Sequence, residues 1–141
     1  MKPLGIRDIV GPIMVGPSSS HTAGALRIAS MVRNLLTDEP ARVTFVLYGS
    51  FAHTYRGHGT DRALVAGLLG FHTDDLQVKN SFDLAKEEEL EFSFEPDPHT
   101  KVAHPNTVDV SVTDRSGNTV TARGVSIGGG AAELVRIDGI D

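Results

Sequence analysis

Three stretches in which apolar residues alternate with mostly polar ones most strongly constrain the fold of this chain. A period of two places alternate side chains on opposite faces of a strand, so each stretch predicts a half-buried strand. Pro96 and Pro98 are predicted to end the second strand, because proline lacks a backbone donor. The apolar positions are Val43, Phe45, Leu47, Leu90, Phe92, Phe94, Val108, Val110 and Val112.

Helical spacing appears between and before these strands. Apolar residues at positions 25, 28, 29, 32, 35 and 36 share one face, which predicts a helix over residues 22–36. A second helix is predicted to begin at Thr60 or Asp61 and to end at Gly70. Residues 49–59 between them are predicted to be a loop, and residues 82–85 a short helix.

The order of these elements predicts an α+β fold. A turn at residues 116–118 and a return strand over residues 119–127 make a hairpin with the third strand. The order α-β-α-β-β-β then predicts a single α/β sandwich over residues 1–141, with one mixed sheet and helices on one face. The tail around Val135 and Ile137 is predicted to be either a last strand or the lead into a further domain.

Composition narrows the classes of function. The chain has 141 residues, 40% of them hydrophobic, which suffices for a packed core. Its formal net charge is −5 with no basic stripe, which disfavours nucleic acid and anionic membranes as partners. Without a signal-peptide pattern or a long apolar run, we expect a soluble, cytoplasmic protein. Because there is no cysteine, any iron–sulfur chemistry must lie on another chain.

The first candidate site is the sequence GPSSSHT before the predicted first helix. Helix N-termini carry unpaired N–H groups and partial positive charge, which favour anions. Hydroxyl groups and an imidazole add donors, so a carboxylate or phosphate would suit this stretch. Alternatively, one serine simply caps the helix. The candidate residues are Ser18, Ser19, Ser20, His21 and Thr22.

The second candidate site is the sequence YRGHGTDRA. Glycines flank His58, and Thr60 and Asp61 open the second helix. An imidazole titrates near neutral pH, which suits a general base. The alternative is a glycine-rich turn with an exposed histidine.

The third candidate site is the sequence HPNT, which supplies hydrogen-bonding groups just before a strand. Pro105 favours an extended His104, and Asn106 and Thr107 add an amide and a hydroxyl group. On its own the motif is also typical of a plain turn.

The fourth candidate site is the sequence SIGGG, in which Gly128, Gly129 and Gly130 follow a strand. These glycines permit positive φ or a close backbone approach. The stretch lacks the features of a P-loop or a dinucleotide fingerprint, and a bulge or hinge is the alternative.

Two other sites are disfavoured. The four histidines His53, His58, His99 and His104 lack the spacing of a metal site, so no metal ligand is predicted in this chain. A serine hydrolase is disfavoured because there is no GxSxG elbow.

Four longer motifs, taken in order, resemble the β-subunit or β-domain of bacterial iron–sulfur-dependent L-serine dehydratase. The resemblance covers about residues 6–132 and implies a fold related to the allosteric substrate-binding domain of some phosphoglycerate dehydrogenases. Family β-subunits often continue into an ACT domain, and this sequence stops where one would begin. The motifs are GPSSSHTAGALRIA, LYGSFAHTYRGHGTDRALVAGLLG, HPNTV and SIGGG.

The resemblance implies a reaction and a partner. The family converts L-serine to pyruvate and ammonia, using a [4Fe–4S] cluster that cysteines of the α-subunit hold and one iron of which acts as a Lewis acid. The chain is therefore expected to bind no cofactor itself, to need that α-subunit for activity and to form a homodimer. Rival hypotheses are a regulatory module that binds an anion or serine, and a purely structural domain.

The resemblance also implies residue roles. His58 corresponds to the general base, and Ser18, Ser19, Ser20, His21 and Thr22 correspond to the loop that binds the substrate carboxylate. Thr60 and Asp61 would position His58 or the substrate. Supporting roles in the pocket or at the α–β interface fall to His104, Asn106, Thr107, Gly128, Gly129 and Gly130.

Overall fold

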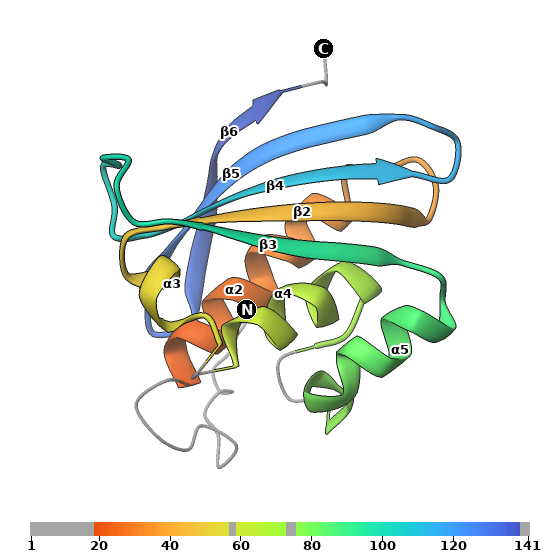
Figure 1. Ribbon diagram of the computed structural model, residues 1–141, viewed down its shortest axis with the longest axis horizontal. Coiled ribbons are helices and arrows are strands. Elements are labelled where there is room, and N and C mark those ends of the chain that lie inside the picture. Colours follow the sequence, from red (N-terminus) through yellow and green to blue (C-terminus); the bar gives the residue numbers. More distant parts are fainter. Residues whose placement is uncertain (1–18, 57–58, 73–75, 139–141) are drawn as a thin grey trace.

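The computed structural model describes residues 19–56, 59–72 and 76–138. Helices and strands follow one another in the order that the sequence predicts, with additional short helices and one additional strand (Figure 1). The elements are α2 (Ser19–Arg33), β2 (Pro40–Tyr48), α3 (Gly49–Thr54), α4 (Thr60–Leu69), the 3₁₀ helix η1 (Leu76–Asn80), α5 (Ser81–Glu87), β3 (Glu91–Asp97), β4 (Asn106–Asp114), β5 (Thr119–Gly128) and β6 (Ala131–Asp138).

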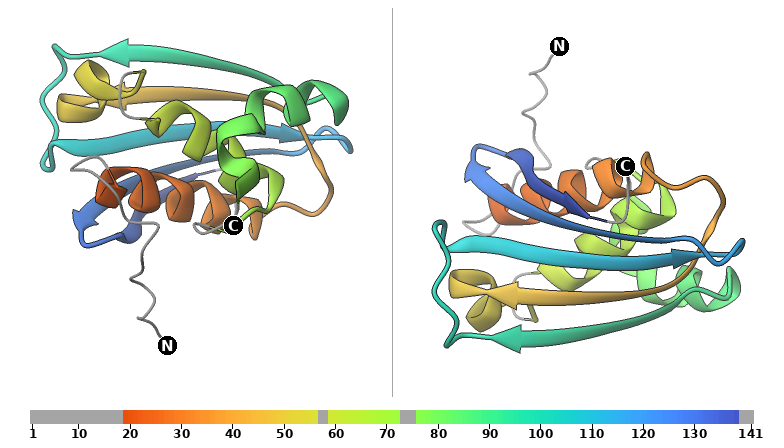
Figure 2. Two further views of the ribbon diagram at one scale, coloured as in Figure 1. Left: turned by 90° about the horizontal axis from the view of Figure 1, so that it is seen from below. Right: turned by 90° about the horizontal axis from the view of Figure 1, so that it is seen from above.

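The five strands form one mixed sheet in the order β3-β2-β4-β5-β6. β2 and β3 are parallel, with the helices α3, α4 and α5 in the crossover between them, and the other pairs are antiparallel. Figures 1 and 2 show the helices gathered on one face of this sheet. The α+β class, the mixed sheet and the one-sided helical layer are therefore confirmed.

The core lies between the sheet and helices α2 and α4. Phe45 in β2 and Val110 in β4 pair in register, and both side chains are fully buried. Ile28 of α2 and Leu64 of α4 are fully buried against them. The two helices cross closely, because a Cβ on Gly67 would lie 2.2 Å from the carbonyl oxygen of Leu26.

Two helix predictions need correction. α2 begins at Ser19 and ends at Arg33, three residues earlier than predicted, and Leu35 and Leu36 pack against the core from beyond its end. The segment predicted to be a loop contains the helix α3. A tertiary contact accounts for α3: the Ser50 amide donates to the Pro105 carbonyl at 2.7 Å, and Phe51 is fully buried.

Two strand predictions also change. Pro96 does not end β3 but lies within it, opposite Leu47, whereas the strand does end at Asp97, directly before Pro98. β3 is an edge strand, where a missing backbone donor costs no ladder hydrogen bond. Of the two alternatives for the tail, the strand is correct, because β6 pairs with β5 through the turn at Gly128, Gly129 and Gly130.

The sheet face opposite the helices carries a polar cluster. Arg123 donates from Nε and Nη2 to the Asp109 carboxylate at 2.7 and 2.9 Å, and the Tyr48 hydroxyl donates to the same carboxylate at 2.8 Å. The guanidinium group of Arg123 also stacks over the Tyr48 ring. These contacts stabilise three neighbouring strands on the face that no described helix covers.

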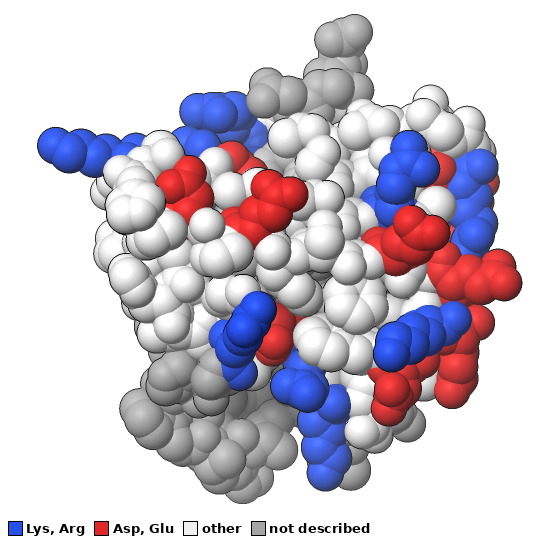
Figure 3. Space-filling model, in the orientation of Figure 1, with Lys and Arg blue, Asp and Glu red and all other residues white. Residues whose placement is uncertain are grey.

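One face of the molecule shows mixed charge. Figure 3 shows acidic and basic side chains interspersed on one face of the molecule, with no broad patch of one sign. None of the helices in the described part of the chain is long and apolar enough to cross a membrane.

Candidate functional site

The predicted anion-binding loop and the predicted base loop meet where α2 and α4 begin. A Cβ placed on Gly59 would lie 4.0 Å from Oγ1 of Thr22. Gly59 adopts φ +80°, a left-handed conformation that glycine accommodates without strain. Sequence motifs about forty residues apart are therefore neighbours at one end of the fold.

The start of α4 is buried and polar. Thr60 is fully buried and Asp61 is 7% exposed. The Asp61 amide donates to the Tyr55 carbonyl at 3.1 Å, which joins the two sides of the segment that contains position 58. The Asp61 carboxylate accepts a hydrogen bond from the Arg62 amide at 2.7 Å.

The environment of Asp61 raises the pKa of its carboxyl group. Burial raises the pKa of its carboxyl, and the Arg62 amide and the charges of Arg62 and Arg56 offset only part of this effect. Among the described residues, its ion-pair contact is long, at 4.0 Å from Nη1 of Arg62. Within the described part of the chain, Asp61 is thus a buried carboxyl group with few partners at the candidate site.

Several predicted site residues are not covered by the structure. Ser18 and His58 lie outside the described residues. The backbone of Ser19, Ser20 and His21 forms the first turn of α2, but the side chains of these three residues also lie outside the described part.

The glycine-rich turn reaches the same end of α2. A Cβ on Gly130 would lie 3.4 Å from Cβ of Ala23, so the turn between β5 and β6 packs against the second turn of the helix. Gly128 and Gly129 are exposed and have positive φ values of 96° and 62°. Open space surrounds the Cβ positions of both, so the backbone of the turn is accessible.

The HPNT motif forms a tight turn held by its own side chains. Nδ1 of His104 accepts from the Asn106 amide at 3.1 Å, and the Thr107 hydroxyl donates to the His104 carbonyl. His104 is thereby occupied in shaping the turn at the start of β4.

Gly24 is a residue of the site that the sequence analysis did not single out, and it lies against Ser126 of the SIGGG motif. A Cβ on Gly24 of α2 would lie 2.1 Å from Oγ of Ser126, so helix and strand are in close contact there. Ser126 is fully buried. The signal was present in the sequence, since a glycine inside a helical pattern often marks a close approach.

Three buried polar atoms in the described residues have no hydrogen-bond partner: Oγ1 of Thr60, Oδ1 of Asn106 and Oγ of Ser126. Each belongs to one of the motifs identified in the sequence. β4 and β5 pair up to Thr107 and Val125, so Asn106 and Ser126 follow directly at the same end of the sheet. An unpaired buried polar group is uncommon and costs about 1–3 kcal/mol, which makes this end of the fold distinctive.

The described residues hold no group of three or more His, Asp or Glu side chains that could bind a metal ion. The chain also has no cysteine with which to ligate an iron–sulfur cluster. The residues present therefore do not fit a cluster held by this chain.

Fold and site together define an α+β domain whose polar loops gather at the starts of two helices. Comparison with known proteins identifies the family: the model for the serine dehydratase beta chain matches residues 7–134. The chain belongs to this family.

The relatives are similar over most of this chain. It is 49% identical over 133 residues to the L-serine dehydratase beta chain of Peptoniphilus asaccharolyticus, covering 94% of this chain and 60% of that protein. It is 43% identical over 141 residues to the probable L-serine dehydratase beta chain of Bacillus subtilis, covering 100% and 63%. The chain thus spans about three fifths of the length of these two relatives.

Proposed function

We propose that this chain is the β part of an L-serine dehydratase, which converts L-serine to pyruvate and ammonia together with an α-subunit. Family membership supports the reaction class. The observation that carries the proposal is the set of three unpartnered buried polar atoms, of Thr60, Asn106 and Ser126, at the end of the fold where the motifs meet. Such unmet hydrogen-bonding capacity is typical of a site completed by a ligand or partner.

In this proposal the start of α2 binds the substrate carboxylate. The N-terminus of a helix presents backbone N–H groups and partial positive charge, which favour an anion. Ser18, Ser19, Ser20 and His21 add donors, and Thr22 lies beside the start of α4. The carboxylate would thereby be fixed with Cα directed toward the segment before α4.

His58 is the proposed general base that removes the Cα proton while the hydroxyl group leaves from Cβ. The resulting enamine then hydrolyses to pyruvate and ammonia. Tyr55 and Asp61, joined by a backbone hydrogen bond, fix the two sides of the segment that carries His58. Asp61 is the proposed positioning residue, because its buried carboxylate has an acceptor position left for an imidazole N–H.

The proposed partner supplies what this chain lacks. A [4Fe–4S] cluster on the α-subunit would act as the Lewis acid for the leaving hydroxyl group. This chain contributes binding and proton removal, and the exposed turn at Gly128 and Gly129 offers accessible backbone for the partner.

Anaerobic reconstitution tests the proposal. The chain is co-expressed with the cluster-bearing α-subunit from the same source, and pyruvate formation from L-serine is measured. We expect activity only when both parts are present, and we expect His58→Ala to abolish turnover without preventing assembly. His53→Ala, at an exposed position of α3, is the matched control and should remain active.

Two outcomes would contradict these assignments. If an α-subunit that is active with another β part forms no pyruvate with this chain, the enzymatic role is wrong. If His58→Ala retains near-normal kcat, another group is the base, and a regulatory anion-binding role becomes the better explanation of the site.

A further inference from the structure

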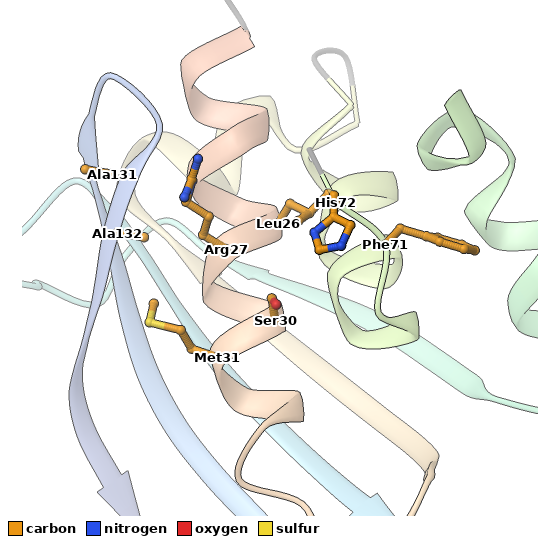
Figure 4. Close-up of a pocket in the computed structure, with 8 residues that line it drawn as sticks. All are labelled: Leu26, Arg27, Ser30, Met31, Phe71, His72, Ala131 and Ala132. Atoms are coloured by element: carbon orange, nitrogen blue, oxygen red, sulfur yellow. The ribbon is translucent and has the colours of Figure 1, made fainter. Parts of the chain in front are cut away.

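A separate cavity of about 500 Å³ lies over the middle of α2, beyond the candidate site. Figure 4 shows α2 as its floor, with Arg27 on the side of Ala131 and Ala132 and with Ser30 on the side of His72. The walls are therefore the start of β6 and the segment that follows α4. The volume falls within the range of small-molecule sites.

The polar side chains of this cavity have no polar contact with the part of the chain that the structure describes. Among the described residues, no hydrogen bond or ion pair engages the side chains of Arg27, Ser30 or His72. Two other arginines are paired with carboxylates, Arg33 with Glu39 and Arg123 with Asp109. The donors of the cavity are thus available to a ligand.

The described residues that line the cavity include basic side chains and no acidic ones. Its described lining contains an arginine and a histidine but no acidic residue, although the chain has 18 Asp and Glu residues and a net charge of −5. A smaller cavity of about 280 Å³ is different, because Glu39 and Glu88 line it together with Arg115. A guanidinium group with no carboxylate among the described residues that line its cavity favours an anionic ligand.

The remaining lining is apolar. Leu26 and Met31 of α2 and the two alanines of β6 lie beside the donors, and Phe71 borders the cavity with its ring directed away from them (Figure 4). A few polar groups within apolar walls are typical of sites for small organic molecules. Inorganic anions would leave these apolar surfaces uncovered.

We propose that this cavity binds a small organic carboxylate that carries a second polar group. Arg27 binds the carboxylate, Ser30 and His72 face the rest of the ligand, and the apolar residues cover its carbon atoms. This site goes beyond the proposed function, because it uses neither His58 nor the α-subunit. It shares α2 with the candidate site, and Ala131 directly follows Gly130, which contacts Ala23.

The test uses the 141-residue chain, L-lactate as the probe and L-lactamide as its uncharged isostere. Binding is followed by isothermal titration and by NMR shifts of backbone amides along residues 26–31 and at position 72. We expect saturable binding of L-lactate and none of L-lactamide. Arg27→Met should weaken L-lactate binding about tenfold or more, as expected for the loss of a charged hydrogen bond.

Arg42→Met is the matched control, because Arg42 is exposed on β2 and lines none of these cavities. It should bind L-lactate as the unaltered chain does, and thermal unfolding of both variants checks that they fold. The proposal is overturned if L-lactate does not bind saturably, if L-lactamide or inorganic phosphate binds equally well, or if Arg42→Met loses as much affinity as Arg27→Met.

Discussion

The side chain of Ser126 in β5 occupies the space beside Gly24 of α2 that any larger residue at position 24 would need. A Cβ on Gly24 would lie 2.1 Å from Oγ and 2.8 Å from Cβ of Ser126, closer than side-chain atoms approach. The next nearest atom, the carbonyl oxygen of Ala131, lies 3.6 Å away. This pair therefore fixes how closely the start of α2 approaches the turn between β5 and β6.

Gly24→Ala should lower the free energy of unfolding by about 1–3 kcal/mol, the usual cost of overpacking a tight contact. Urea unfolding measures this change. In a Ser126→Gly background the same alanine should cost much less, because both clashing atoms are gone. An equal cost in the two backgrounds would contradict the contact as its cause.

Thr60→Val should leave stability unchanged or slightly raised, because the lost hydroxyl is buried without a partner. Thr107→Val is the control: Thr107 is also buried, but its hydroxyl donates to the His104 carbonyl, so its loss should cost about 1 kcal/mol. In the reconstituted enzyme, Thr60→Val should lower kcat/KM. A large loss of stability from Thr60→Val would mean that this hydroxyl is bonded within the chain.

Local pattern predicted the main elements because burial in this fold follows strand and helix periodicity. Phe45 and Leu47 are fully buried where alternation placed them, and Leu64 and Leu68 where helical spacing placed them. α3 escaped prediction because its six residues carry little helical pattern and depend on the contact of Ser50 with Pro105.

The candidate site was predictable as motifs but not as an arrangement. The sequence identified Thr22 and Thr60 separately, whereas their proximity depends on how α2 packs against α4. The contact between Gly24 and Ser126 requires a helix and a strand a hundred residues apart to meet. No local sequence pattern predicts a contact between residues so far apart in the chain. A glycine inside a helix, such as Gly24, indicates only that some close contact is present.

Asp109→Asn should destabilise the protein by about 2 kcal/mol at neutral pH, as expected for the loss of charged hydrogen bonds. Burial alone would raise the pKa of the Asp109 carboxyl, but hydrogen bonds from Arg123 and Tyr48 outweigh it and hold this pKa below its ordinary value. A lowered folded-state pKa gives stability that is present above the unfolded value of about 3.9 and is lost as the pH falls below it. Urea unfolding from pH 7 to pH 3 should show the wild-type advantage shrinking below about pH 4.

Asp61→Asn should show the opposite dependence on pH. Burial raises the pKa of Asp61 above its unfolded value, so the wild-type chain is favoured at low pH and loses that advantage as the pH rises through the folded-state value. Asparagine keeps an acceptor for the Arg62 amide, which makes it a conservative variant. Its stability relative to wild type should therefore increase between pH 3 and pH 7.

Activity separates the electrostatic effect of Asp61 from its proposed role. If Asp61→Asn is at least as stable as the wild-type chain at pH 7, it should still have a lower kcat in the reconstituted enzyme. The reason is that an amide does not orient a histidine base as a carboxylate does. The pH profile of kcat should also shift. If kcat and its pH profile are unchanged, Asp61 does not position the base. If the stability difference between Asp61→Asn and wild type does not vary with pH, the raised pKa of Asp61 is wrong.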